Sequence, residues 1–195
     1  MTTPHIAIII GSTRPSRWGT EPANWLLEKA KARTDMTFEL VDLADFDLPL
    51  FDEVASNLWV PSEGEAAKKW QAKIAEFDGY IFVTAEYNRS ITGALKNALD
   101  QAYVEWNRKP MTAFGYGSIG AARAVEHLRT IAIELQMVPV RSGLHLGAGD
   151  FFAAHPLGAG KGVAAVEENL LPSTEAMFDD LAWWAKATKA ARDAA

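Results

Sequence analysis

The 195-residue sequence contains no cysteine, and this absence excludes several kinds of chemistry. Disulfides, thiolate metal sites and cysteine nucleophiles all need that residue. Its absence also fits a reducing, cytoplasmic environment. The histidines, His5, His127, His145 and His155, show no metal-ligand spacing, and there is no H-E-x-x-H motif. We therefore expect neither a bound metal ion nor a covalent thiol intermediate.

Long apolar segments are also missing. No run approaches the roughly 18 residues of a membrane span, and no basic region leads into an apolar stretch at the N-terminus. We therefore expect no membrane association and no signal peptide. The net charge of −6 argues against nucleic acid as a partner. The length predicts one domain over residues 1–195.

The sequence alternates between short apolar runs and longer segments with helical spacing. The runs are continuously apolar, which indicates a parallel sheet covered on both faces. The fold class is therefore α/β, a three-layer sandwich with a five-stranded parallel sheet and helices on both sides. The five predicted strands are His5–Ile10, Thr37–Asp42, Gly79–Thr84, Met111–Tyr116 and Met137–Arg141.

Helix signals lie between these runs. Ser62 and Glu65 resemble a capping box, and Ser173 with Glu175 predicts the start of a last helix. Two long segments, Leu48–Pro61 and Gly143–Pro172, are predicted loops at the rim of a site. The predicted helices begin near Pro22, cover Ala66–Ala75, follow an apolar face from Leu95 to Trp106 and another from Val125 to Leu135, and run on from Ser173.

The segment Gly11–Gly19, of sequence GSTRPSRWG, follows the first apolar run and is unsuited to a core. A polar loop between a strand and a helix can cradle an anion, because its amides and the helix N-terminus face the ligand. The segment lacks both the G-x-G-x-x-G fingerprint and the Walker A pattern. Its hydroxyls and guanidinium groups favour a single phosphate; the alternative is a polar turn with solvated arginines.

Two further loops lie at the same edge of the predicted sheet. They read TAEYNRSITGALKNALD, residues 84 to 100, and GYGSIGAARA, residues 115 to 124. Ligands of open α/β sheets bind beyond the carboxyl ends of the strands, so the three loops should share one ligand. Tyr87 could stack on a flat ring and Asn88 could hydrogen-bond it. Gly115, Gly117 and Gly120 would let the backbone approach that ring.

On these motifs the chain resembles the NADPH-dependent FMN reductases of the flavodoxin-like fold, a group that includes quinone, azo-dye and chromate reductases. The resemblance is carried by IIIGSTRPSRWG, LPLFDE, EYNRSITGALKNALD, KPMTAFGYGSIGAARAVEHLR and MFDDLAWWAKA, in the family's order. Ala85 and Thr92 replace two prolines of the usual pattern, and Arg89 stands where a small residue is common.

The resemblance implies FMN as cofactor and NADPH or NADH as co-substrate. The hydride would pass through FMN, in ping-pong fashion, to a small-molecule electron acceptor: a quinone, an azo or nitro compound, a metal oxyanion or free flavin. No catalytic side chain is expected, because the flavin carries the chemistry, and Glu86 is expected to shape its loop. The implied cofactor-binding residues are Ser12, Thr13, Arg14, Ser16, Arg17, Trp18 and Gly19 around the phosphate, Ala85, Glu86, Tyr87 and Asn88 beside the isoalloxazine, and Gly117 and Ser118 at its pyrimidine side.

The family's dimer helix corresponds to the segment with Lys96, Asn97 and Asp100, so a homodimer or homotetramer is expected. Tyr103 and Trp106 are predicted to continue its apolar face beyond what the sheet needs. Two other readings stay open. A flavodoxin-type electron carrier would bind FMN without NAD(P)H activity, and a structural or regulatory domain would bind no FMN. A low-molecular-weight phosphatase would need a cysteine.

Overall fold

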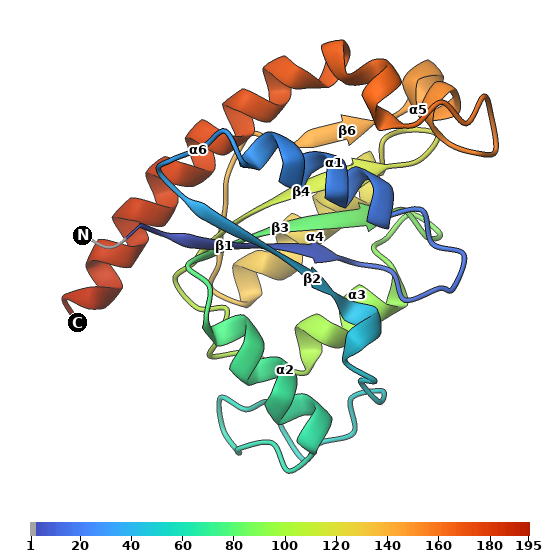
Figure 1. Cartoon of the computed structure of the whole chain (residues 1–195). Helices are drawn as coiled ribbons and strands as arrows, with labels where there is room; N and C mark the ends of the chain where they lie inside the picture. The colour runs from blue at the N-terminus through green and yellow to red at the C-terminus, as the bar shows by residue number, and fades with distance from the viewer. Residues whose placement is uncertain (1–2) are drawn as a thin grey trace.

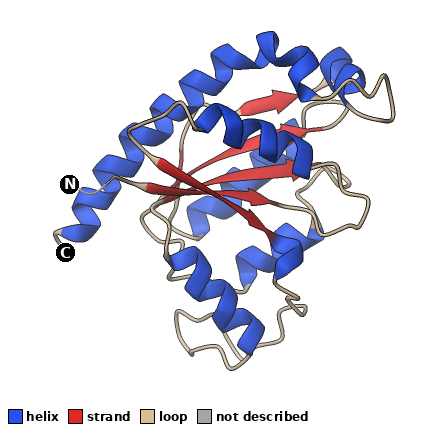
Figure 2. Cartoon of the chain, viewed as in Figure 1, coloured by secondary structure: helices blue, strands red, loops and turns tan. Residues whose placement is uncertain are grey.

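The computed structural model describes residues 3–195 and is built around a parallel sheet (Figures 1 and 2). The strand order is β2-β1-β3-β4-β5, and β6 also pairs with β4. This is the flavodoxin-like order, whose ligand site lies at the switch point between β1 and β3. The strands are β1 (His5–Ile10), β2 (Thr37–Asp42), β3 (Gly79–Ala85), β4 (Pro110–Tyr116), β5 (Val138–Pro139) and β6 (Leu144–Leu146).

Helices cover both faces of the sheet, as the apolar strands require (Figure 2). Side chains alternate between faces along a strand, so Ile6 and Ile8 join one core cluster while Ala7 and Ile9 join the other. Among the described residues, no helix has the length and apolar character to cross a membrane. The helices are α1 (Thr20–Ala30) and α6 (Glu167–Asp193) on the first face, α2 (Glu65–Ala75), α3 (Gly93–Asp100) and α4 (Ala122–Glu134) on the second, and α5 (Ala148–Ala154) after β6.

The first four strands agree with prediction to within one residue at each end, but the fifth does not. Only Val138–Pro139 pairs as β5, and the edge of β4 is then taken over by β6. Pro139 has no N–H to donate, and proline interrupts a strand for that reason. Thr112 bridges the gap, where its hydroxyl donates to the carbonyl of Ser142 at 2.6 Å. The strand beside the functional end of β4 is therefore β6.

The predicted capping box at Ser62 and Glu65 was wrong. The Ser62 hydroxyl instead accepts a hydrogen bond from Gln71 Nε2 at 2.8 Å. The amides of Glu63 and Gly64 donate to the carboxylate of Glu53, at 3.2 and 3.0 Å. The carboxylate that accepts the hydrogen bonds at the start of α2 thus lies ten residues earlier, in the preceding loop, where no local pattern reveals it.

Two other helix predictions also need correction. The last helix begins at Glu167 rather than Ser173 and contains Pro172, which costs it one intrahelical hydrogen bond. The apolar face after Gly93 does not continue as a helix, since α3 ends at Asp100. Trp106 lies in a turn, fully buried, with its ring 4.8 Å from that of Tyr80. It covers the sheet and is not available to a second chain.

The predicted loop Gly143–Pro172 is in fact mostly ordered secondary structure. It contains β6, α5, the short helix η2 (Val163–Val166) and the start of α6. The glycine and alanine content of this segment made it look like a loop. In addition, β6, α5 and η2 are each too short to show a clear hydrophobic period.

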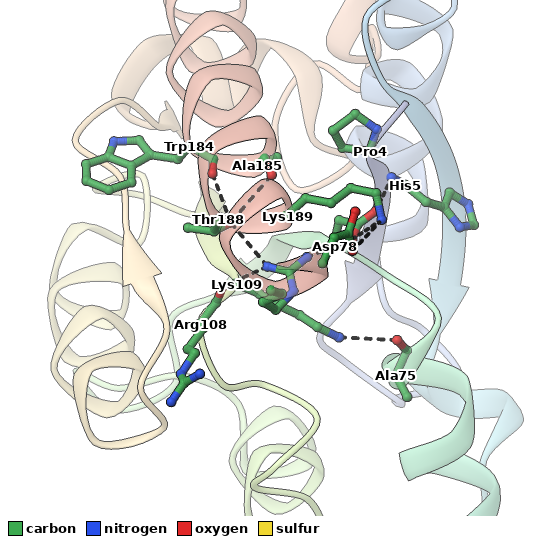
Figure 3. A network of polar contacts seen from close by, with 12 residues as sticks. Pro4, His5, Ala75, Asp78, Arg108, Lys109, Trp184, Ala185, Thr188 and Lys189 are labelled. Carbon is green, nitrogen blue, oxygen red and sulfur yellow. Dashed lines mark hydrogen bonds and ion pairs between the residues drawn. The ribbon is translucent and has the colours of Figure 1, made fainter. Parts of the chain in front are cut away.

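A polar network occupies the amino ends of the strands, at the opposite end of the sheet from the loops considered below (Figure 3). The Asp78 carboxylate accepts from the amide of His5 at 3.0 Å and from Lys189 and Arg192 at 3.3 and 2.7 Å. Beside it, the buried ammonium of Lys109 donates to the carbonyl of Ala75 at 3.3 Å. This end of the molecule is held by charges that serve structure.

The buried Lys109 predicts a stability that rises with pH. Burial, aided by the nearby charge of Arg192, lowers the pKa of Lys109 from 10.5 to about 8. Between these values the unfolded chain binds more protons, so the free energy of unfolding increases with pH. From pH 8 to 9.5 we expect wild type to gain about 2 kcal/mol relative to Lys109→Met. Urea unfolding of both proteins measures this, and parallel pH curves would contradict it.

Candidate functional site

A cleft of about 740 Å³ lies beyond the carboxyl ends of β1, β3 and β4. In Figure 1 these strands point to the side where their following loops gather with α5. The volume lies within the range of small-molecule and cofactor pockets. All but two of the predicted site residues line it: Ser12, Arg14, Ser16, Arg17, Trp18, Ala85, Glu86, Tyr87, Asn88, Gly117 and Ser118.

The two exceptions lie close by. Thr13 faces a neighbouring hollow of about 440 Å³, which it shares with Leu48 and Asn97. Gly19 backs the cleft wall, where an added Cβ would stand 2.7 Å from the hydroxyl of Tyr116. Its lack of a side chain therefore lets Tyr116 line the cleft.

The first loop presents one arginine to the cleft and uses the other to hold itself in place. Arg17 forms an ion pair with Asp42 at 2.5 Å, with both side chains less than a fifth exposed, and donates to the carbonyl of Arg14 at 3.2 Å. Arg14 is exposed and, among residues 3–195, bonds only neutral groups, the hydroxyls of Tyr87 at 3.3 Å and Ser16 at 3.2 Å. Its charge is thus free to meet an anion.

The first and second loops are joined through Thr92, one of the departures from the family's usual pattern. Its hydroxyl donates to the carbonyl of Gly11 and accepts from the amide of Leu95 at 3.1 Å. The second contact caps the N-terminus of α3. A proline at this position could make neither contact, so the threonine fixes the spacing between the two loops.

Glu86 shapes its loop, as expected from the sequence. Its carboxylate accepts from Arg123 Nε at 2.6 Å and from the amides of Arg123 and Ala124 at 3.1 and 3.3 Å. Burial by itself would raise the pKa of Glu86, but the hydrogen bonds and charge of Arg123 and the Ala124 amide outweigh it and lower the pKa. A carboxylate so held is ionised, poorly basic, and committed to the first turn of α4.

The glycines of the third loop serve two purposes. At Gly117, with φ of +146°, an added Cβ would meet nothing within 4 Å, so its backbone borders open space in the cleft. An added Cβ on Gly115 would lie 2.5 Å from the carbonyl oxygen of Gly120. One on Gly120 would lie 2.9 Å from the His145 Cβ. Of the three glycines expected to approach a ring, Gly117 borders open space, whereas Gly115 and Gly120 permit close packing of the loop.

A fourth wall of the cleft, made by α5 and the turn after it, was not predicted from the sequence. Phe151, His155 and Leu157 line the cleft there. The Trp18 ring lies 4.8 Å from that of His155 and 5.9 Å from that of Phe151, in edge contacts. Burial lowers the pKa of His155 despite the opposing charge of Glu21, so the imidazole is neutral near pH 7. The i, i+4 spacing of Phe151 and His155 was the available signal.

Glu21 ties this wall to α1. Its carboxylate accepts from the indole N–H of Trp18 at 2.5 Å and from the amide of Val163 at 2.8 Å. These hydrogen bonds fix the orientation of the Trp18 indole and hold the segment after α5 against the first loop. The other cleft residues that were outside the predicted cofactor-binding set are Arg89, Tyr116, Ile119, Ala121 and Arg123.

The donor set fits a phosphorylated flat molecule such as FMN. Ser12, Ser16 and Arg14 offer hydroxyl and guanidinium donors at one end of the cleft. Aromatic side chains and the open backbone at Gly117 border the rest. Outside the cleft lining, Ser90 and His127 Nδ1 make a Ser–His contact at 2.7 Å, but no described carboxylate bonds that histidine. The cleft thus suits a cofactor that brings its own chemistry.

Comparisons with known proteins agree with this geometry. A sequence model described as "NADPH-dependent FMN reductase" matches residues 4–150. The NAD(P)H-dependent FMN reductase ntnL of Nectria sp is 38% identical over 159 residues, which cover 76% of this chain and 79% of that protein. The 2-hydroxy-1,4-benzoquinone reductase of Burkholderia sp is 36% identical over 140 residues, 68% of this chain and 72% of that protein. FerB, a flavoenzyme NAD(P)H:(acceptor) oxidoreductase of Paracoccus denitrificans, shares the fold with a TM-score of 0.70 and 24% identity, over 95% of this chain and 98% of its own.

Proposed function

Because the chain belongs to the NADPH-dependent FMN reductase family, and is an NAD(P)H-dependent oxidoreductase with FMN as its cofactor, we propose that its described cleft passes a hydride from the nucleotide to a quinone-type acceptor. The observation that carries this assignment is Arg14, a cation whose partners in the described part of the chain are all neutral, beside the hydroxyls of Ser12 and Ser16. We place the FMN phosphate there.

The bound FMN supplies the redox chemistry, since its ring accepts and releases the hydride. The residues of the chain bind and orient. Ser12, Arg14 and Ser16 hold the phosphate, while the backbone at Ala85 and Gly117 borders the ring. The Tyr87 hydroxyl, which bonds Ser12 and Arg14 at 3.3 Å, links the phosphate end of the cleft to its ring end. Truncating Tyr87 should weaken positioning without abolishing hydride transfer.

The walls of the cleft support a flat, apolar acceptor. Trp18, Phe151 and Leu157 face it from the side of α1 and α5. Two substrates that use one open face of a ring must bind in turn, which gives ping-pong kinetics. Among the described residues that line the cleft, Glu86 is the only one with a carboxylate, and it forms an ion pair with Arg123.

Anaerobic mixing of FMN-loaded protein with NADPH, and separately with NADH, tests the proposal. We expect the flavin absorbance to bleach with at least one nucleotide and to return when a benzoquinone is added. If neither nucleotide reduces the flavin, the protein is an electron carrier and not a reductase. A reduced flavin that quinones do not reoxidise would refute the acceptor class alone.

We propose that the chain forms a homodimer through the segment after β2 and the helix α3. Leu50, Val54 and Trp59 are 82%, 91% and 78% exposed, far more apolar surface than one loop usually carries. Asn97 of α3 holds this segment, donating to the Pro49 carbonyl at 2.7 Å and accepting from the Phe51 amide at 2.9 Å. A second copy would cover both elements.

Light scattering at micromolar concentration should therefore give twice the chain mass, and Trp59→Glu should give one chain mass. Trp183→Glu is the matched control, because Trp183 is also an exposed tryptophan, at 64%, but lies on α6. A wild-type protein with the mass of one chain would rule the dimer out. A tetramer would show that a further surface also associates.

We also propose that residues 1–195 act as one flavin-binding domain in the cytoplasm, where the reducing nucleotide is produced. Fractionation of the source cells, with NAD(P)H-dependent quinone reduction as the assay, tests the location.

A further inference from the structure

Arg89 stands on an unusual turn at the rim of the cleft. Tyr87 and Ser90 exchange backbone hydrogen bonds at 2.9 and 3.1 Å, so Asn88 and Arg89 form a two-residue hairpin loop. Both have left-handed backbones, with φ of 50° and 72°. This is the pattern of a type I′ turn, in which asparagine and then glycine are preferred. An arginine in the glycine position strains the backbone, and strained residues are enriched at functional sites.

The charge of Arg89 is not used within the described structure. Of the four arginines that line the cleft, Arg17 pairs with Asp42 and Arg123 pairs with Glu86. Arg14 bonds two hydroxyls at the phosphate end. Arg89 makes no ion pair or side-chain hydrogen bond with any of residues 3–195, and its side chain is exposed. The cleft therefore carries a second available cation, on a different loop from the first.

We propose that Arg89 binds a phosphoryl group of the reducing nucleotide. The assignment rests on the proposed function. A small quinone fits wholly inside the cleft, whereas a dinucleotide with its nicotinamide on the flavin extends outward past an exposed rim residue. A guanidinium also matches phosphate with two parallel hydrogen bonds. The phosphoryl group is either the pyrophosphate, which NADH and NADPH share, or the 2′-phosphate, which only NADPH carries.

Binding of NADP⁺ and NAD⁺ to the oxidised, FMN-loaded protein separates these sources. By calorimetry, Arg89→Gln should raise the Kd of NADP⁺ by about tenfold or more. A matching rise for NAD⁺ assigns the pyrophosphate, and an unchanged NAD⁺ affinity assigns the 2′-phosphate. Arg89→Lys should recover part of the loss, and added salt should weaken wild type more than Arg89→Gln. Unchanged affinity for both nucleotides would overturn the proposal.

Arg108 offers a matched control. It is an exposed arginine with a left-handed backbone, φ of 60°, at the far end of the sheet, and in Figure 3 its guanidinium points away from the network around Asp78. Arg89→Gly and Arg108→Gly should both keep or raise the unfolding midpoint, since glycine relieves the same strain. Only Arg89→Gly should lose nucleotide affinity. If Arg108→Gly loses it equally, the effect is non-specific charge and the proposal fails.

Failure of this inference can be told apart from failure of the proposed function. If either nucleotide reduces the flavin of wild type and Arg89→Gln behaves the same, only the role of Arg89 is refuted. If neither nucleotide reduces or binds the wild-type protein, both fall. If Arg89→Gln slows only reoxidation by an anionic quinone, the residue serves the acceptor and the nucleotide assignment is overturned.

Discussion

Arg14→Ala is expected to weaken FMN binding by about ten- to hundredfold, because it removes a charge-assisted hydrogen bond of about 1.5–3 kcal/mol. Arg14 is the right residue to test, since its guanidinium has no carboxylate partner among the described residues and faces the cleft. Titration of the FMN-free protein, followed by quenching of flavin fluorescence, measures the change.

The matched control is Arg141→Ala, an exposed arginine that does not line this cleft. It changes the net charge equally and should leave FMN affinity unchanged. Arg17→Ala should behave differently again. It leaves Asp42 without its partner, so it should lower the unfolding midpoint of the FMN-free protein, whereas Arg14→Ala should not. FMN affinity that is the same in Arg14→Ala and wild type would refute the placement of the phosphate.

Glu86→Gln is expected to cost stability and leave the chemistry intact. The Glu86 side chain is 8% exposed and joins the second loop to the first turn of α4 through Arg123. Glutamine keeps an acceptor for the amides but loses the ion pair. Since Arg123 is 42% exposed, solvent screens part of that pair, and we expect a loss of about 1–2 kcal/mol. Flavin reduction by the nucleotide should stay within a few-fold of wild type, measured by stopped flow on fully loaded protein.

The pH dependence of this difference gives an independent check. The folded-state pKa of Glu86 is depressed below its ordinary 4.5, so the stabilisation is present above that value and disappears as pH falls through the folded-state pKa. The gap between wild type and Glu86→Gln should therefore close in acid. Glu126→Gln, at an exposed position on the same helix, is the matched control and should change stability little. If Glu86→Gln stops flavin reduction while FMN stays bound, the carboxylate has a chemical role and the proposed mechanism is wrong.

Local sequence determined the sheet and most of its loops. The apolar runs of β1, β3 and β4 are long enough to show that they are buried on both faces, and glycine or polar residues that a core would reject follow each of them. The edge strand β2 is only partly buried. A strand end is a local event, so the residues at the carboxyl edge follow directly. Strand ends located the loops after β1, β3 and β4, and the resemblance to the family then implied the individual cofactor-binding residues. All of these but Thr13 and Gly19 line one cleft.

Contacts between distant segments decided the rest. The carboxylate of Glu53 accepts a hydrogen bond from the amide of Gly64 at the start of α2. Arg17 forms an ion pair with Asp42, and Glu86 forms one with Arg123. Each is a long-range polar pairing that no spacing rule contains. The fourth wall of the cleft depends on Trp18 packing against α5, more than a hundred residues later in the chain. Hydrophobic periodicity and turn preferences depend on a few neighbouring residues. The partner of a charged or aromatic side chain depends instead on which distant segments the packed sheet brings together.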